Sequence, residues 1–243
     1  MHHATVVHQD DRFTVVDDFL APAELDLVWN FLQVQEFRSV DVFGSVEHWS
    51  LEDTAARKAP TVAWGTSKGD VRFPTDTPAD LFIAAMLAHA DVFERNIGLP
   101  ERDWAGLTAA PMLYPRGTGL VWHRDTEEYT GSYTFYAHPQ WNVEWGGELL
   151  MHAHDFPRDS GVFFHQLRRV PGEEPIPMTA HLDNEDASAA LLAHGVGSFV
   201  MPKPNRLVII GGGTPHTVSR VRASAGRHVR ASISGFFRKA GLP

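Results

Sequence analysis

Apolar residues follow two different spacings along the chain, and the change between them divides the sequence. From about residue 105 onward, short apolar or alternating runs are separated by turn residues, a pattern typical of antiparallel strands. These runs occupy residues 107–114, 120–123, 133–137, 148–152, 197–201, 206–210 and 230–237. The second part of the chain is therefore predicted to fold as a β-barrel or β-sandwich.

The first part of the chain carries helical spacing instead. After a predicted strand over residues 12–20, apolar side chains recur on one helical face across residues 22–32. A second helix is predicted to begin at Thr77, whose side chain can cap it, and to end at Gly98, which can adopt a left-handed conformation. We expect these two helices to support the β-rich part.

Two further segments show neither pattern. Residues 38–76 contain several glycines and prolines and are predicted to form a loop-rich excursion with short strands that covers a site. Residues 153–196 are long, polar and rich in proline, and are predicted to form a loop. We expect residues 1–243 to form a single domain, in which residues 12–104 support a core formed by residues 105–243.

The composition narrows the class of protein. The chain has 243 residues, of which 43% are apolar and 21% charged, as in an ordinary soluble globular protein. It has no apolar stretch of membrane-spanning length and no secretory signal, so a cytoplasmic location is the default expectation. The formal net charge of −9 and the lack of a long basic run argue against a nucleic-acid partner.

Cysteine is absent, which limits the chemistry that the chain can perform. Disulfides, zinc–thiolate sites and cysteine nucleophiles are excluded. The chain does contain 14 histidines and many carboxylates, so any metal site must use nitrogen and oxygen ligands.

The strongest candidate for such a site is His123-Arg124-Asp125. Side chains at i and i+2 of a strand point to the same face, so His123 and Asp125 can aim at one point. Taken alone, a His-x-Asp tripeptide is more often a surface pair than a metal site. His216 is the best third ligand, because it follows the apolar run 207–210 and a glycine-rich turn at 211–213. Two imidazoles and a carboxylate would form a facial triad, which suits Fe(II) and leaves coordination positions open.

Several short motifs surround these residues in a particular order. They are the N-terminal VVDDFLAPAEL, Tyr114 and Gly117 ahead of His123, the strand 133–137, Trp141 with the run Trp145-Gly146-Gly147-Glu148-Leu149, His216-Thr217-Val218, and Arg230-Ala231-Ser232 leading to Gly235-Phe236-Phe237.

Together these motifs resemble the catalytic core of the iron(II)/2-oxoglutarate-dependent oxygenases, in the prolyl-4-hydroxylase-like branch. The resemblance covers most of the chain and implies a mainly β fold, a double-stranded β-helix (jelly-roll, cupin-like) core with N-terminal supporting helices. It also implies that His123, Asp125 and His216 bind Fe(2+) and act as the catalytic centre. Halogenating relatives replace this carboxylate with a small residue, so Asp125 points to hydroxylation or another oxidation without halide.

The resemblance further implies a cosubstrate, 2-oxoglutarate, that reacts with O2. A cation must hold its far carboxylate, and Arg230 fits that role because a guanidinium pairs bidentately with a carboxylate. Ser232 and Tyr114 are expected to add hydrogen bonds. The interval from His216 to Arg230 is a little longer than usual in this branch, which makes Arg227 a rival anchor.

Other side chains are weaker candidates. Trp122, Tyr133 and Trp145 are candidates to line the substrate pocket, although core packing is the commoner role of such aromatics. Arg116 is a candidate contact for an anionic substrate, with exposure to solvent as the alternative.

A second metal site would draw on His152, His154 and His165, but histidines in a polar segment usually face solvent.

Three functions remain open from the sequence. The first is an oxygenase that oxidises an unactivated C–H bond of a small molecule, such as an amino acid or a secondary metabolite. The second is a hydroxylase of a protein or peptide side chain. The third is a non-redox, cupin-like metal protein or isomerase. The compact chain, without an added recognition region, favours the first.

Overall fold

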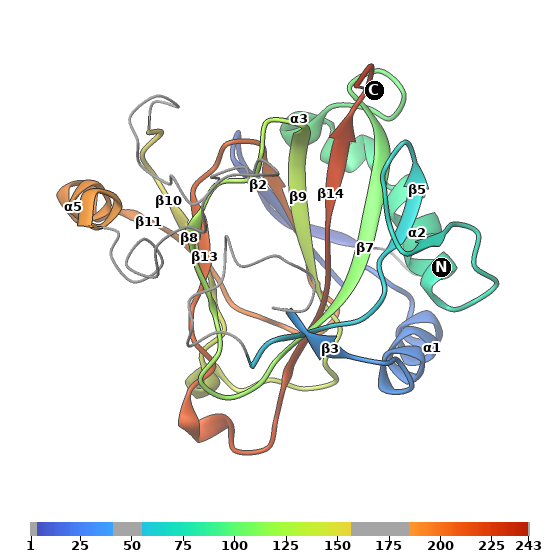
Figure 1. The fold of residues 1–243 in the computed structure, drawn as a ribbon, viewed down its shortest axis with the longest axis horizontal. Coiled ribbons are helices and arrows are strands. Elements are labelled where there is room, and N and C mark those ends of the chain that lie inside the picture. Colours follow the sequence, from blue (N-terminus) through green and yellow to red (C-terminus); the bar gives the residue numbers. More distant parts are fainter. Residues whose placement is uncertain (1–3, 41–54, 157–184, 243) are drawn as a thin grey trace, which may run out of the picture.

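The fold is built on two β-sheets that face each other, and all of their strand pairs are antiparallel except β5 with β6 (Figure 1). The computed structural model describes residues 4–40, 55–156 and 185–242. The larger sheet has ten strands and the smaller one has four. This arrangement confirms the predicted mainly β, jelly-roll core.

The larger sheet forms the centre of the molecule. Its strands run in the order β1 (Thr5–Gln9), β2 (Phe13–Asp17), β12 (Leu207–Gly211), β9 (Tyr129–Tyr136), β14 (Arg230–Lys239), β7 (Trp104–Tyr114), β4 (Arg57–Lys58) and β3 (Arg38–Ser39), with β5 (Val62–Gly65) and β6 (Val71–Arg72) attached beside β7. The smaller sheet runs in the order β11 (Gly197–Val200), β10 (Leu149–His152), β13 (His216–Val218) and β8 (Leu120–His123).

Alternation along the central strands gives the larger sheet two different buried faces. On β12, Leu207 and Ile209 belong to the core on the helix side, whereas Val208 and Ile210 pack between the two sheets. A central strand that is covered on both faces has apolar residues at every position, as in residues 207–210. The face between the sheets is the one that carries the candidate site.

The N-terminal helices cover the other face of the larger sheet (Figure 1). Helix α1 (Pro22–Gln33) buries Val28 and Leu32, and α2 (Ala79–Ala88) buries Phe82 and Met86. This confirms the predicted support by helices. None of the helices in the described part of the chain is long and apolar enough to cross a membrane.

The prediction of one continuous helix from Thr77 to Gly98 is wrong, because the segment forms three shorter elements. Helix α2 ends at Ala88, a 3-10 turn occupies Ala90–Phe93, and the short α3 spans Glu94–Ile97. The tighter turn directs Phe93 into the core, where it is fully buried. Gly98 ends the segment with a φ of 75°, as expected. Thr77 Oγ1 accepts a hydrogen bond from the backbone N–H of Ala79 at 3.3 Å, but Pro78 rather than Thr77 occupies the N-cap position of α2.

The prediction for residues 153–196 is also partly wrong. Helix α5 (Glu185–His194) lies within this segment. Ala190 and Leu191 pack against Phe156, which gives this short helix an apolar contact. Short strands between residues 38 and 76 are confirmed for the described part of that segment, while residues 41–54 and 157–184 lie outside the described residues. Strand β1 was not predicted, because its residues are all exposed and show no alternation.

Candidate metal centre and cosubstrate pocket

Strands β8 and β13 bring the three predicted metal ligands together. His123, the last residue of β8, pairs directly with His216, the first residue of β13, and their ring centroids lie 4.3 Å apart. Asp125 follows β8, and its Oδ1 lies 3.9 Å from Nε2 of His123. The ligand atoms of the three side chains all lie within 4.8 Å of one another, so they face one common point.

The hydrogen bonds of the two imidazoles fix which nitrogen faces that point. Nδ1 of His123 lies 2.8 Å from the carbonyl oxygen of Val121, and Nδ1 of His216 lies 2.9 Å from that of Thr214. A carbonyl only accepts hydrogen bonds, so each Nδ1 carries the proton and each Nε2 presents a lone pair. Both imidazoles are at least 94% buried, with exposed fractions of 6% and 5%.

This donor set fits one divalent transition metal. Two neutral imidazole nitrogens and one carboxylate, with no thiolate, suit Fe(II) in a facial triad that leaves positions for other ligands. In the part of the chain that the structure describes, no other group of histidines and carboxylates meets the same distance criterion.

Arg230 lies on β14, on the face of the larger sheet that looks toward the metal ligands, and only 1% of it is exposed. Its Cζ lies 4.8 Å from the ring centroids of both Tyr114 and Tyr136. Its Nε donates to the carbonyl of Gly147 at 3.0 Å, and its Nη1 approaches Oγ of Ser232 at 3.4 Å. Backbone and aromatic rings thus hold the guanidinium in one orientation.

Two buried polar atoms in this pocket have no hydrogen-bond partner among the described residues. They are Nη2 of Arg230 and the hydroxyl of Tyr136. Burial raises the pKa of Tyr136, and the charge of Arg230 acts against that rise, although no hydrogen bond of regular geometry joins the two groups. A buried donor without a hydrogen-bond partner lowers the stability of the folded protein. A ligand carboxylate in this pocket would satisfy both.

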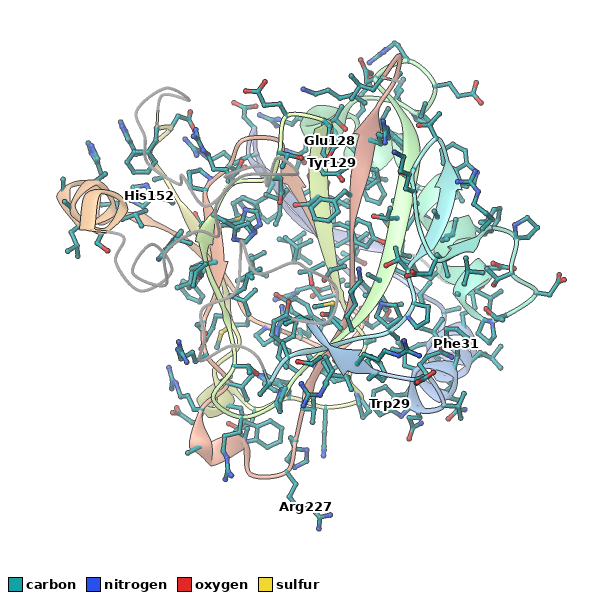
Figure 2. All side chains as sticks on the ribbon, viewed as in Figure 1. Trp29, Phe31, Glu128, Tyr129, His152 and Arg227 are labelled. Atoms are coloured by element: carbon teal, nitrogen blue, oxygen red, sulfur yellow. The ribbon has the colours of Figure 1, made fainter. Side chains whose placement is uncertain are left out.

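The rival anchor lies elsewhere. Arg227 is exposed, and its side chain points away from the molecule (Figure 2). The geometry therefore favours Arg230 for a buried carboxylate.

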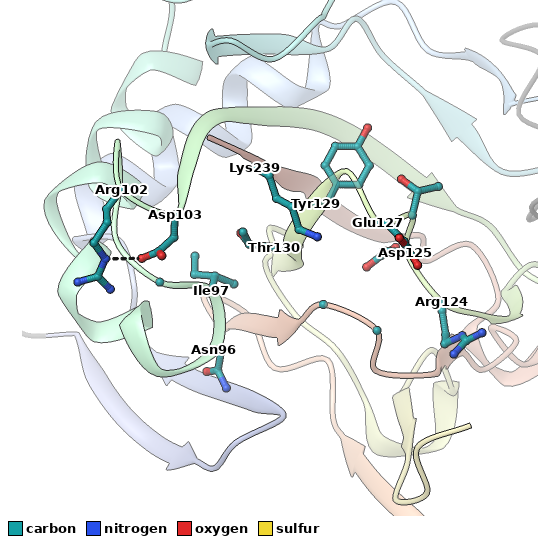
Figure 3. A pocket seen from close by; sticks show the side chains of 14 residues that line it. Asn96, Ile97, Arg102, Asp103, Arg124, Asp125, Glu127, Tyr129, Thr130 and Lys239 are labelled. Atoms are coloured by element: carbon teal, nitrogen blue, oxygen red, sulfur yellow. Dashed lines mark hydrogen bonds and ion pairs between the residues drawn. The ribbon is translucent and has the colours of Figure 1, made fainter. Parts of the chain in front are cut away.

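Two hollows adjoin Asp125. The first is a cavity of about 210 Å³ between the sheets, lined by Val40, Lys58, Ala110, Met112, Tyr114, Leu120, His123, Asp125, Ser234 and Phe236. The second is a groove of about 450 Å³ that opens to solvent and is lined by Arg102, Asp103, Arg124, Asp125, Glu127, Tyr129 and Lys239, among others (Figure 3). Asp125 can therefore be reached from two sides, and His123 from the cavity between the sheets.

A stacked aromatic pair lies where these hollows meet. The rings of Tyr129 and Phe236 have centroids 4.5 Å apart and an angle of 24° between their planes. Burial, followed by the nearby charge of Glu128, raises the pKa of Tyr129 to about 12. The phenol is therefore a neutral hydrogen-bonding group at ordinary pH.

Comparison with known proteins agrees with this geometry. A family model of the 2OG-Fe(II) oxygenase superfamily matches residues 109–238, which is more than half of the chain and includes the three clustered ligands and Arg230. The chain belongs to this superfamily. It is an oxidoreductase whose cofactors are Fe(II) and 2-oxoglutarate. A search of curated proteins finds no match to its sequence.

Solved structures place the oxygenase near the prolyl-4-hydroxylase branch in fold. A prolyl-4-hydroxylase from Pseudomonas putida shares 18% identity, with 93% of this chain and 92% of that chain covered, at a TM-score of 0.56. HygX from Streptomyces hygroscopicus, with nickel and 2-oxoglutarate bound, shares 11% identity, with coverage of 95% and 84%, at a TM-score of 0.55. A prolyl hydroxylase from Trichoplax adhaerens, in complex with a hypoxia-inducible-factor peptide, shares 15% identity, with coverage of 94% and 84%, at 0.53.

The aromatic residues predicted to line the substrate pocket of the oxygenase lie away from both hollows. Tyr133 belongs to the core on the helix side of the larger sheet, and its hydroxyl donates to the carbonyl of Thr108 at 2.7 Å. Trp145 stacks on His228, with ring centroids 4.2 Å apart. Trp122 packs against Phe156 on the outer side of β8.

Arg116, the other predicted substrate contact, is exposed in the turn between β7 and β8. None of these four side chains lines either of the two hollows beside Asp125, and their contact with a substrate stays a prediction. Trp122 is next to His123 in sequence and therefore points to the opposite face of β8.

Sequence reasoning missed Tyr136, which completes the pocket around Arg230. Its place follows from the register of two distant strands, which the sequence does not reveal: Tyr136 pairs directly with Ser232, so both lie on the same face of the sheet. Tyr133, three residues earlier, must lie on the other face.

The suggested second metal site is disfavoured by the hydrogen bonds of His152. Its Nδ1 accepts from the backbone N–H of His154 at 3.1 Å, and its Nε2 lies 3.3 Å from the carbonyl oxygen of Leu191. Neither nitrogen is left for a metal. His154 instead stacks on His194, with ring centroids 3.8 Å apart, and His165 lies outside the described residues.

Proposed function

We propose that the oxygenase binds Fe(II) through His123, Asp125 and His216 and oxidises a C–H bond of a small molecule, with 2-oxoglutarate converted to succinate and CO2. The observation that carries this proposal is the convergence of two Nε2 lone pairs and one carboxylate within 4.8 Å. The third candidate from the sequence, a non-redox cupin-like protein, is disfavoured by membership of the oxygenase family.

The pocket around Arg230 would hold the far carboxylate of 2-oxoglutarate. Arg230 supplies the charge, the rings of Tyr114 and Tyr136 lie against its guanidinium, and the hydroxyl of Ser232 lies 3.4 Å from its Nη1. The unpaired Nη2 of Arg230 and the unpaired hydroxyl of Tyr136 support this assignment, since a carboxylate would accept from both.

The metal and the keto acid together supply the oxidising power, and the protein supplies position and a dry site. The fixed tautomers of His123 and His216 orient the ligand nitrogens before any metal arrives. Asp125 adds one negative charge, which reduces the net charge of a divalent ion at this buried position. Leu120 and Phe236 line the cavity with apolar surface and so limit water near the reacting atoms.

A small substrate is favoured by the size of the cavity beside His123 and Asp125. A volume of about 210 Å³ suits compact ligands rather than a folded partner. A peptide is the second candidate, supported by the solvent-open groove on the other side of Asp125 (Figure 3). Relatives in fold bind both kinds of molecule: HygX has been solved with hygromycin B, and the Trichoplax adhaerens enzyme with a peptide.

The deciding experiment is a succinate-release screen. Purified oxygenase with Fe(II), 2-oxoglutarate and O2 is incubated with amino acids, small metabolites and peptides, and succinate and oxidised products are measured by mass spectrometry. We expect a small molecule to stimulate succinate release by the wild-type protein. The His216→Ala variant should release no succinate. Stimulation by peptides alone would favour the second candidate, and an enzyme that never consumes 2-oxoglutarate would contradict the proposal.

A further inference from the structure

A lysine with no part in the proposed chemistry points into the solvent-open groove beside Asp125. Lys239, the last residue of β14, is half-buried and lines this groove, and Figure 3 shows its side chain directed into it. Its backbone N–H donates to the carbonyl of Glu128 at 2.9 Å, which holds the end of the strand in place. Among the described residues, the ammonium group of Lys239 forms no hydrogen bond and no ion pair.

Two of the acidic side chains that line the same groove are already engaged. Asp103 accepts hydrogen bonds at 2.8 Å from Nε of Arg102 and at 2.8 Å from the backbone N–H of Leu99. Asp125 is a proposed metal ligand. The ammonium group of Lys239 is therefore available to a ligand that enters the groove, and binding sites commonly use a charged group of this kind to orient a ligand.

The position of Lys239 along β14 separates it from the proposed anchor of the cosubstrate. The strand begins at Arg230 and ends at Lys239, so their backbones lie roughly 30 Å apart at the usual rise of a strand. Phe236, which lines the cavity beside the metal ligands, lies between them and roughly 10 Å from Lys239 along the strand. A molecule of 2-oxoglutarate held by the metal and Arg230 is too short to reach Lys239.

The stacked rings of Tyr129 and Phe236 connect the groove with the cavity. Tyr129 lines the groove, Phe236 lines the cavity, and Asp125 lines both. In Figure 3, Tyr129 lies between Lys239 on one side and Asp125 on the other. A ligand that lies along Tyr129 would place one end at the ammonium group and the other toward the metal ligands. Aromatic surface beside a cation suits a molecule with an apolar chain and an anionic end.

We propose that Lys239 binds a carboxylate of the substrate in the groove, while an apolar chain of the same molecule extends over Tyr129 toward the metal ligands. This inference rests on the proposed function, because it concerns the substrate of that site. Lys239 is a specificity-determining residue, which selects extended carboxylic acids whose charged end lies far from the oxidised carbon. A doubly charged phosphate is disfavoured, because acidic side chains also line the groove, namely Asp103, Asp125 and Glu127.

The test compares carboxylic acids with matched molecules of different charge. The protein is loaded with Ni(II) in place of Fe(II) and with 2-oxoglutarate, and dissociation constants are measured by calorimetry. The probes are aliphatic carboxylic acids and amino acids of increasing chain length, each paired with its carboxamide and with an alkyl phosphate of the same length. The same probes are tested for stimulated succinate release with Fe(II). The variants are Lys239→Met, Lys239→Arg and, as a matched control, Lys68→Met at an exposed lysine that lines neither hollow.

We expect at least one acid to bind wild type about three- to tenfold more tightly than its amide, between the strength of an exposed ion pair and that of a charge-assisted hydrogen bond. Lys239→Met should remove this preference. Lys239→Arg should keep most of it, because the charge remains, and Lys68→Met should leave it intact. Added salt should reduce the preference in wild type, because an ion pair open to solvent is screened.

Chain length gives a second measurement, which a merely solvated lysine would not affect. A carboxylate at Lys239 lies roughly 10 Å along the strand from the cavity, so long acids should stimulate succinate release and the shortest should not. The inference is overturned if amides or phosphates bind as well as acids, or if no acid binds. It is also overturned if the preference survives in Lys239→Met, or if the shortest acids stimulate release as strongly as the long ones.

The binding of 2-oxoglutarate separates this inference from the proposed function. Wild-type protein that fails to bind or consume 2-oxoglutarate would contradict the proposed function. Intact cosubstrate binding in wild type with no preference for acids would contradict only the role of Lys239. Loss of 2-oxoglutarate binding in Lys239→Met would also overturn that role, because it would assign the lysine to the cosubstrate or to the fold.

Discussion

Gly147 and Arg230 are in contact so close that the glycine has no room for a side chain. A Cβ atom at Gly147 would lie 2.9 Å from Cδ of Arg230, and the carbonyl of Gly147 accepts the hydrogen bond from Nε of the same arginine. Gly147 also has a φ of 77°, which L side chains rarely adopt. The paired glycines that follow Trp145 therefore do more than form a turn: the second one shapes the pocket of the proposed cosubstrate anchor.

Gly147→Ala is expected to raise the KM for 2-oxoglutarate severalfold, because the added methyl group displaces the stem of Arg230. The backbone strain should also cost on the order of 1–3 kcal/mol of stability. Steady-state kinetics and urea unfolding measure the two effects. Gly226→Ala is the control: it has a φ of 60° with no atom within 4 Å of its Cβ, so it should lose stability without a change in KM. Equal KM values in the two variants would contradict the role given to Gly147.

Arg230→Met is expected to raise the dissociation constant of 2-oxoglutarate by about 10- to 100-fold, the range of a lost charge-assisted pair. The dissociation constant of Arg230→Lys should lie between those of wild type and Arg230→Met, because lysine keeps the charge but not the bidentate geometry. Arg227→Ala should have no effect, because Arg227 points into solvent (Figure 2). Calorimetry on the Ni(II)-loaded protein measures all three. A larger effect at Arg227 would reverse the assignment.

Tyr136→Phe tests the second unpaired group of the pocket. Its hydroxyl has no partner among the described residues, so its removal should change the free energy of unfolding by less than about 1 kcal/mol while weakening 2-oxoglutarate binding about tenfold. Tyr133→Phe is the matched control and should behave in the opposite way. It breaks the hydrogen bond to Thr108 on the other face of the sheet and should cost about 1 kcal/mol of stability with unchanged binding. Urea unfolding measures the stability of both variants, and calorimetry measures their affinity for 2-oxoglutarate. Unchanged 2-oxoglutarate binding in Tyr136→Phe would contradict the role of its hydroxyl.

Replacement of a proposed ligand tests the metal centre directly. His123→Ala and His216→Ala should each weaken Fe(II) binding by more than about a hundredfold. Replacement of a residue that only hydrogen-bonds to a metal ligand already lowers metal affinity by about 10- to 100-fold, and loss of a ligand itself should lower it further. Circular dichroism should show that both variants stay folded. His154→Ala, at an exposed histidine, should bind Fe(II) like wild type. Unimpaired binding in either ligand variant would place the metal elsewhere.

The three proposed ligands could be found in the sequence because their positions follow from local rules. Residues two apart on a strand share a face, which pairs His123 with Asp125, and an apolar run followed by glycines marks the strand and turn ahead of His216. The strands of the core were predicted to within a few residues for the same reason.

Features that depend on pairing between distant strands could not be predicted in this way. Arg227 and Arg230 lie three residues apart, and only the register with Tyr114 places Arg230 in the pocket. Lys58 lies on a two-residue strand that has no periodicity to detect, and it reaches the cavity only through its pairing with Met112. The turn within the second helix reflects the packing of Phe93 against the sheet, which no local signal in the sequence reveals.

The buried histidine beside the anchor pocket should make stability depend on pH. Burial lowers the pKa of His138 to about 4, with the charge of Arg230 acting in the same direction, although carbonyl oxygens of Pro202 and Ala231 lie 2.8 Å and 3.2 Å from its two nitrogens. The folded protein then binds fewer protons than the unfolded chain between the folded pKa and the ordinary value of about 6.5.

The contribution of His138 to stability is therefore fully present above pH 6.5 and falls as the pH drops toward 4, by about 2 kcal/mol between pH 7 and pH 5. Urea unfolding at these two pH values should show this loss in wild type and a smaller loss in His138→Asn, which cannot take up a proton. The same comparison in His228→Asn, at an exposed ring, should match wild type. An identical pH dependence in His138→Asn and wild type would mean that His138 is already protonated in the folded state, held by its two carbonyl neighbours.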